Sequence, residues 1–209
     1  PVAEADRAMI LVHGRGADAR SILGLAPHLT QPGLTFVAPQ AAGNTWYPYS
    51  FLMPLAQNEP YLSSALETLG ATVQRLRYAG LPSEKIYLLG FSQGACLSLE
   101  FAARHAVRYG GVFGLSGGLI GPPGTPRNYA GNFGGTPVFL GCSDVDTHIP
   151  KERVLETAEV LERMGAAVTT RLYPNMPHTI NDDEIEAVNT IVNSELKMRF
   201  GQKSPKTPI

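Results

Sequence analysis

The sequence of 209 residues has few cysteines and few charges. Two cysteines are too few for a disulfide scaffold, so both are expected to be free thiols. Charged residues make up only 17%, and 17 basic against 18 acidic side chains give a net charge of −1. This balance excludes a nucleic-acid binder that works by bulk positive charge, because such proteins carry a basic face.

Long hydrophobic runs are also missing. No apolar segment approaches the roughly 20 residues that a membrane helix needs, so no membrane insertion is expected. The start of the chain, residues 1–7, carries two acids and no apolar stretch, and therefore does not resemble a signal peptide. A cytoplasmic location is the expectation.

What the sequence does contain is an alternation of two patterns. Residues 8–12 form a short run that is apolar throughout, typical of a strand buried in a parallel sheet. Further candidate strands lie at 34–38, 85–89, 111–115, 136–140 and 168–173. Stripes of helical spacing lie between them, at 62–76, 154–161 and 185–192, with a weaker candidate at 19–29. We expect Asp182 and Asp183 to cap the last helix.

This alternation predicts one α/β domain over residues 1–200, with an open, mostly parallel sheet and helices on both faces. No linker divides it, and the 44% of hydrophobic residues suffices for a core. The polar, basic residues 201–209, which include two prolines, are expected to form a flexible tail.

The strongest chemical signal is Gly-Phe-Ser-Gln-Gly at residues 90–94, between an apolar run and a helical stretch. This pattern is typical of a nucleophile elbow, in which a strained turn presents Ser92 and glycines let strand and helix approach each other. The alternative is an ordinary glycine-rich turn between a strand and a helix.

A serine hydroxyl needs a base, and the base needs an orienting acid. His178 follows the last predicted strand, where sites of α/β proteins lie, and is the predicted base. Of the two acids in the loop after the preceding strand, Asp146 is favoured over Asp144 because of its distance from the next helix. His148 is an alternative base, whereas His105 is expected on the surface.

The backbone N–H groups of Arg15 and Gln93 are the predicted oxyanion donors. Gln93 directly follows the nucleophile, and Arg15 lies in the loop after the first predicted strand, where glycines let the backbone approach a developing oxyanion. Two other kinds of site compete with this interpretation. A metal could use His13, Asp144, Asp146, His148 and His178, although no metal-binding spacing supports it. Cys96 or Cys142 could be read as a nucleophile, but Cys96 is expected to pack inside and Cys142 has no dedicated partner.

The segment from Gln40 to Pro60 is rich in aromatic residues and has no periodicity. We expect Trp46, Tyr49 and Phe51, together with Met176 beside the base, to line the substrate pocket. The alternative is that the segment packs into the core.

Four motifs occur in order: Leu-Val-His-Gly-Arg-Gly at 11–16, Gly-Phe-Ser-Gln-Gly-Ala at 90–95, Asp-Thr-His-Ile-Pro at 146–150 and Met-Pro-His at 176–178. Together they resemble the phospholipase/carboxylesterase family of α/β-hydrolases, which includes the acyl-protein thioesterases. The resemblance spans residues 9–196. It implies an α/β-hydrolase fold without a separate lid domain, with Ser92, Asp146 and His178 as triad and Arg15 and Gln93 as oxyanion donors.

Two departures from the family pattern indicate which branch of the family the chain resembles. Pro177 stands where the family often has a glycine, and residues 46–51 differ from the thioesterase branch, in which an acidic stretch follows the tryptophan. The chain is therefore more similar to a bacterial carboxylesterase branch.

The predicted function is hydrolysis of a small-molecule ester or thioester of small or medium chain length, with no cofactor and no metal. The alternatives are lysophospholipase or acyl-protein thioesterase activity, opening of a lactone or dienelactone, and a non-catalytic binding module. Assembly as a homodimer stays open.

Overall fold

The computed structural model of the protein describes residues 5–29 and 31–200. The expected flexible tail, residues 201–209, lies outside the described residues.

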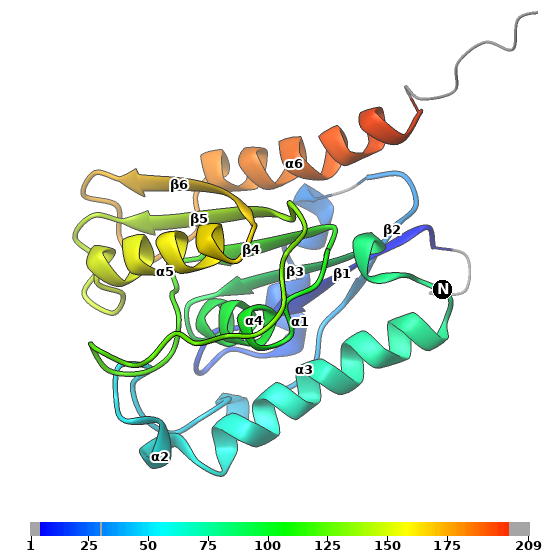
Figure 1. Cartoon of the computed structure of the whole chain (residues 1–209). Coiled ribbons are helices and arrows are strands. Elements are labelled where there is room, and N and C mark those ends of the chain that lie inside the picture. The colour runs from blue at the N-terminus through cyan, green and yellow to red at the C-terminus, as the bar shows by residue number, and fades with distance from the viewer. Residues whose placement is uncertain (1–4, 30, 201–209) are drawn as a thin grey trace, which may run out of the picture.

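The core of the structure is a sheet of six parallel strands in the order β2-β1-β3-β4-β5-β6 (Figure 1). The strands are β1 (Arg7–Val12), β2 (Leu34–Val37), β3 (Ile86–Phe91), β4 (Gly111–Leu115), β5 (Pro137–Ser143) and β6 (Ala167–Tyr173). Each predicted strand corresponds to one of them, and β1 and β4 are buried at every position. The predicted α/β fold is confirmed, and the sheet is parallel throughout.

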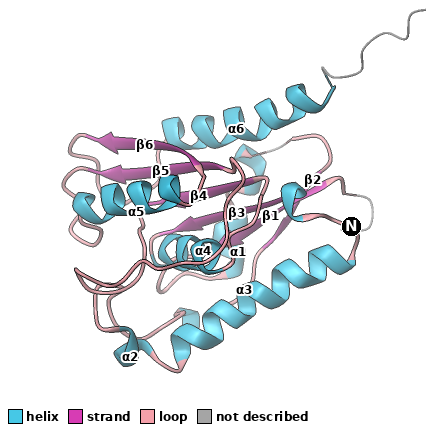
Figure 2. Ribbon diagram, viewed as in Figure 1, coloured by secondary structure: helices cyan, strands magenta, loops and turns pink. Residues whose placement is uncertain are grey.

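Helices cover both faces of this sheet (Figure 2). They are α1 (Ala19–Leu23), α2 (Leu55–Asn58), α3 (Tyr61–Tyr78), α4 (Gln93–Arg104), α5 (Lys151–Arg163) and α6 (Asp182–Phe200). Apolar side chains of α3, α4 and α5 share one core cluster, and those of α1 and α6 share the cluster on the other face. The helix expected over 19–29 ends at Leu23, and a separate 3-10 turn, Ala26–His28, contains Pro27. Proline ends the pattern there because it cannot donate the backbone hydrogen bond of a continuing helix.

The expected cap of α6 by Asp182 and Asp183 is wrong, because Asn181 occupies the capping position. Its side chain accepts a hydrogen bond from the Glu184 backbone N–H (2.8 Å), and the Glu184 carboxylate accepts one from the Asn181 N–H (2.9 Å). This reciprocal pair is a capping box. The two aspartates lie in the first turn instead, where their negative charges interact favourably with the positive N-terminal end of the helix dipole.

The site of interest lies at the point where the strand order reverses. From β1 the chain moves to β2 on one side and then crosses to β3 on the other, so the loops after β1 and β3 emerge side by side. In open α/β sheets, ligands bind at this switch point, outside the carboxyl ends of the strands.

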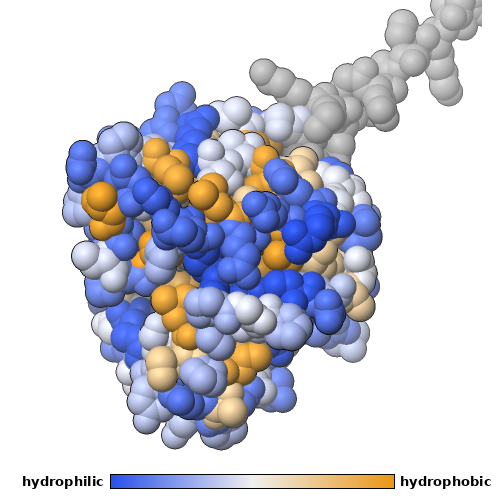
Figure 3. Space-filling model, turned by 60° about the vertical axis from the view of Figure 1, so that its left-hand side comes forward, coloured by the Kyte–Doolittle hydropathy of each residue, from blue (hydrophilic) through white to orange (hydrophobic). Residues whose placement is uncertain are grey.

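Two long excursions meet over this end of the sheet. The segment after β2 contacts the segment after β4, because the Gly121 N–H donates to the Phe51 carbonyl (2.7 Å). The buried Arg153 of α5 holds the second excursion through the Leu119 and Gly121 carbonyls (2.7 and 2.6 Å). Figure 3 turns this end toward the viewer and shows a hydrophilic band between hydrophobic patches.

Glu184 gives the fold a pH dependence. Its side chain is buried against Gly141 of β5, and its Oε1 has no hydrogen-bond partner among the described residues. Burial raises the pKa of Glu184 to about 7, from an ordinary value of 4.5, although the Asn181 N–H works against the rise. The folded state therefore binds more protons than the unfolded state between these two values, and stability falls as pH rises from about 4.5 to about 7.

We predict that Glu184→Gln removes this loss while keeping the capping box, because glutamine can accept the same hydrogen bond. The variant should gain up to about 3 kcal/mol of unfolding free energy over wild type at pH 8, and little at pH 5. The measurement is Tm by circular dichroism for both proteins from pH 5 to 8. Parallel curves would contradict a buried, titrating Glu184.

Candidate active site

Ser92 occupies the sharp turn between β3 and α4, as the sequence predicts. Its backbone has φ 54° and ψ −120°, a strained conformation for a residue with a side chain. A Cβ atom on Gly90 would lie 2.2 Å from the Gly94 carbonyl oxygen, and one on Gly94 would lie 2.1 Å from the Val12 oxygen. Both glycines are therefore required by close backbone approach.

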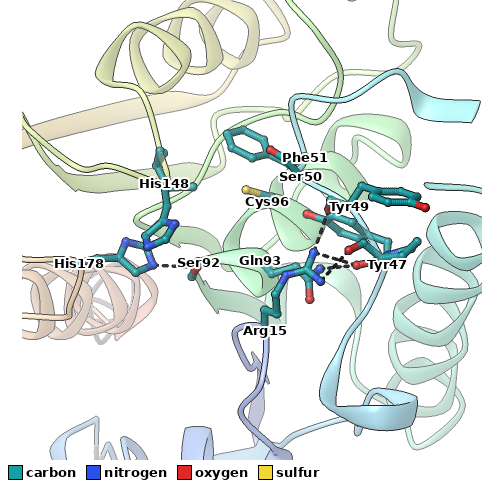
Figure 4. Close-up of a pocket in the computed structure, with 12 residues that line it drawn as sticks. Arg15, Tyr47, Tyr49, Ser50, Phe51, Ser92, Gln93, Cys96, His148 and His178 are labelled. Carbon is teal, nitrogen blue, oxygen red and sulfur yellow. Dashed lines mark hydrogen bonds between the residues drawn. The ribbon is translucent and has the colours of Figure 1, made fainter. Parts of the chain in front are cut away.

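A line of hydrogen bonds connects Ser92 with His178 and Asp146. The Ser92 Oγ lies 2.8 Å from His178 Nε2 (Figure 4). His178 Nδ1 lies 2.6 Å from Asp146 Oδ2. The second carboxylate oxygen accepts the backbone N–H groups of His148 (2.8 Å) and Ile149 (3.0 Å). An imidazole that donates from Nδ1 to the carboxylate leaves Nε2 free to accept the serine proton.

The environment of Asp146 favours its charged form. Burial by itself would raise the pKa of this carboxyl, but hydrogen bonds from His178 and from the two backbone N–H groups outweigh burial and hold the pKa below its ordinary value. Asp146 is therefore ionised at neutral pH, as an orienting acid needs to be.

The other candidate bases and acids lie elsewhere. Asp144 accepts the Asn175 N–H (2.9 Å) and so ties the loop after β5 to the loop after β6. His148 is exposed, with its ring centre 4.8 Å from that of His178. His105 is exposed at the end of α4, as expected.

The two predicted oxyanion donors lie on the adjacent loops after β1 and β3. Gly14, which precedes Arg15, lies so close to the turn that a Cβ atom on it would be 3.4 Å from the Ser92 Cβ. The backbone N–H groups of Arg15 and Gln93 donate to no acceptor in the described part of the chain. Both are thus available to an oxygen atom bound beside Ser92, which supports their predicted role.

A cavity of about 630 Å³ opens beside Ser92. Its walls are Arg15, Tyr47, Pro48, Tyr49, Ser50, Phe51, Ser92, Gln93, Cys96, His148, Ile149 and His178. Of the predicted pocket residues, Tyr49 and Phe51 reach it.

Trp46 and Met176 are not among the lining residues. The Trp46 side chain is buried beneath the loop, with its Nε1–H bonded to the His13 carbonyl (2.8 Å). The Met176 sulfur faces the Asn181 amide (2.9 Å) at the start of α6.

The side chains of Arg15 and Gln93 hold the cavity wall, a role that was not predicted from the sequence. The Arg15 guanidinium donates to the carbonyls of Tyr47, Pro48 and Tyr49 at 2.8–2.9 Å. The Gln93 amide donates to the Tyr47 carbonyl (2.8 Å) and accepts the Trp46 N–H (3.0 Å). No spacing rule could find these contacts, because they join segments more than 30 residues apart.

The competing sites gain no support. Burial raises the pKa of both Cys96 and Cys142 to about 12, so neither forms a thiolate nucleophile at neutral pH. Both ring nitrogens of His13 contact backbone groups, the Gly14 carbonyl and the Ala41 N–H. Within residues 5–29 and 31–200, no group of three or more His, Cys, Asp or Glu side chains is arranged to hold a metal ion.

The helices in this described part of the chain do not meet the needs of a membrane span. None of them is long and apolar enough to cross a membrane.

Comparisons with known proteins agree on one family. The sequence profile described as Phospholipase/Carboxylesterase matches residues 1–196. A crystal structure of a phospholipase/carboxylesterase from Dyadobacter fermentans is 47% identical, with a TM-score of 0.89 over 94% of this chain and 93% of that one.

Two fungal proteins called acyl-protein thioesterase 1 are more distant. The one from Debaryomyces hansenii is 25% identical over 92% of this chain and 93% of its own length. The one from Gibberella zeae is 30% identical, but the match spans only 56% of this chain and 51% of that protein.

The close approach at Gly94 gives a test of the elbow. We predict that Gly94→Ala lowers the unfolding free energy by about 2–3 kcal/mol, because the backbone of β1 or α4 has to move. Gly70→Ala in α3 is the matched control, since its Cβ would lie 3.6 Å from Phe101, and alanine should stabilise that helix by about 0.5–1 kcal/mol. Urea unfolding of both variants measures the difference, and equal stability would contradict the packing described.

Proposed function

This chain belongs to the phospholipase/carboxylesterase family and is a serine hydrolase of that family, and on this premise we propose that Ser92, His178 and Asp146 are its catalytic triad. The observation that carries the proposal is the hydrogen-bonded line from Asp146 through His178 to Ser92. We propose carboxylic esters of small or medium chain length as substrates.

The reaction would proceed through an acyl-enzyme. His178 Nε2 takes the Ser92 proton while Oγ attacks the ester carbonyl, and Asp146 stabilises the imidazolium. The negative charge on the carbonyl oxygen is held by the Arg15 and Gln93 N–H groups. His178 then gives its proton to the leaving alcohol, and water attacks the acyl-enzyme with His178 again as base. The products are a carboxylic acid, an alcohol and the free enzyme.

The cavity supports the proposed substrate size. A volume of about 630 Å³ falls within the usual range for small-molecule pockets. Phe51 and Tyr47, both buried, and Ile149 give it a bulky apolar wall. Such a wall favours short acyl groups over long lipid chains.

The name of the two fungal relatives, acyl-protein thioesterase 1, favours a second candidate, hydrolysis of acyl thioesters. The ratio of kcat/KM for p-nitrophenyl butyrate to that for palmitoyl-CoA separates the two candidates. A ratio well above one supports the short-chain esterase, and a ratio below one supports the thioesterase.

Ser92→Ala should abolish esterase activity. Loss of the nucleophile typically lowers kcat by on the order of 10⁴- to 10⁶-fold. The measurements are p-nitrophenyl butyrate hydrolysis and labelling by a fluorophosphonate, with Tm as a control for folding. Turnover at the wild-type rate, or labelling at another residue, would contradict the proposed nucleophile.

Asp146→Asn and Asp144→Asn make the same chemical change two residues apart. The first removes the charge that orients His178 and should lower kcat by roughly 10⁴-fold. The second keeps an acceptor for the Asn175 N–H and should change kcat by less than about tenfold. Equal effects of the two substitutions on ester hydrolysis would show that the acid of the triad lies elsewhere.

A further inference from the structure

The cavity is lined by basic side chains and by no acidic ones. Its twelve lining residues include Arg15, which carries a positive charge, and two histidines, but no aspartate or glutamate. The one acid of the proposed triad, Asp146, has a fully buried side chain behind His178. A cleft lined by one sign of charge attracts ligands of the opposite sign.

Arg15 differs from the arginines that form ion pairs in the kind of group that its guanidinium contacts. Arg104, Arg127, Arg153 and Arg171 each contact a carboxylate at 2.7–3.0 Å. Arg15 contacts three backbone carbonyls and forms no ion pair with any described residue. Its positive charge, exposed at the cavity wall, is therefore not neutralised by the protein.

The same three hydrogen bonds fix the guanidinium in place. They use three of its five N–H donors, one on Nη1 and two on Nη2. The Nε–H and one Nη1–H remain for a ligand, and a group already held in position loses little freedom on binding one. Because these two donors lie on different edges of the guanidinium, a carboxylate would accept one of them, in a charge-assisted hydrogen bond.

The position of Arg15 indicates which part of a substrate it would contact. His178, which protonates the leaving group in the proposed reaction, lies together with His148 on one side of Ser92 (Figure 4). Arg15, Tyr47 and Tyr49 lie on the other side. The leaving alcohol belongs beside the histidines, so the acyl group extends toward Arg15.

We propose that Arg15 is a specificity-determining residue that binds a carboxylate on the acyl group, so that the enzyme prefers half-esters of short dicarboxylic acids to neutral esters. This inference rests on the proposed function, because it assigns a substrate class to the same site. The carboxylate would accept one of the free donors of the guanidinium while the ester carbonyl lies at Ser92.

The test compares monoethyl glutarate with its neutral analogue ethyl 4-carbamoylbutanoate, which has nearly the same shape. Ethanol release gives kcat/KM for each ester. In wild type the charged ester should be preferred about tenfold, the scale of a charge-assisted hydrogen bond at an exposed site. Arg15→Gln should bring the ratio to about one.

Arg77→Gln is the matched control, because Arg77 is an exposed arginine that lines a separate cavity between α3 and α4. It removes the same charge and should leave the ratio at its wild-type value. Because Arg15 also supports the loop, only the ratio of the two esters is interpreted; a purely structural role would lower both rates equally. A ratio that survives Arg15→Gln, or a wild-type ratio of one or less, overturns the inference.

Salt provides a second measurement if Arg15→Gln fails to fold. The wild-type ratio should fall several-fold between 20 and 500 mM NaCl, since salt screens an exposed ion pair but not a neutral contact. A ratio unaffected by salt overturns the inference. If the neutral ester is still hydrolysed and Ser92 is labelled, the proposed function stands without it; if neither ester reacts and Ser92 is not labelled, both fail.

Discussion

The close packing of α4 against the end of β1 is the constraint on which the site depends. Without a side chain at Gly94, the helix begins within van der Waals distance of the Val12 and His13 carbonyls. This contact brings the first N–H of α4 beside the loop after β1, and the same turn holds Ser92 in its strained conformation. A nucleophile and two backbone donors thus come together through a single steric condition, before any side chain contributes.

A second layer of contacts extends from that point to the cavity wall. His13, Arg15 and Gln93 adjoin the elbow, and their side chains bind the backbone of residues 41–49. The His13 carbonyl also accepts the Trp46 indole N–H. Asn58 at the end of α2 fixes the next residues through the Tyr49 N–H (2.9 Å) and the Ser50 carbonyl (3.0 Å). The cavity wall is therefore anchored on the same residues whose backbone would stabilise the oxyanion in the proposed reaction, and a change in one affects the other.

Local patterns were sufficient to predict the fold and to place the candidate site residues. Buried parallel strands leave continuous apolar runs, and an elbow needs its glycines, so the positions of Ser92, Asp146 and His178 at strand ends followed from the sequence. The cap of α6 was misplaced by one residue, because Asn181 and the two aspartates after it are equally suitable capping residues by type.

The cavity wall was harder to predict. Residues 40–60 have no periodicity that separates inward from outward side chains, so Trp46 and Phe51 could not be told apart. The side-chain contacts of Arg15 and Gln93 depend on how two distant loops meet, and no spacing along the chain records that.

The members of the proposed triad differ in how firmly the sheet holds them. Ser92 follows β3, which pairs on both sides, whereas His178 follows the edge strand β6, which pairs only with β5 and alternates between exposed and half-buried residues. Edge elements open locally at a lower free energy than the centre of a domain. As temperature or denaturant concentration rises, β6 would thus open first and carry His178 away from Ser92, while the rest of the sheet stays assembled. Reversible inactivation should precede global unfolding, and amide hydrogen exchange should be faster in β6 than in β3.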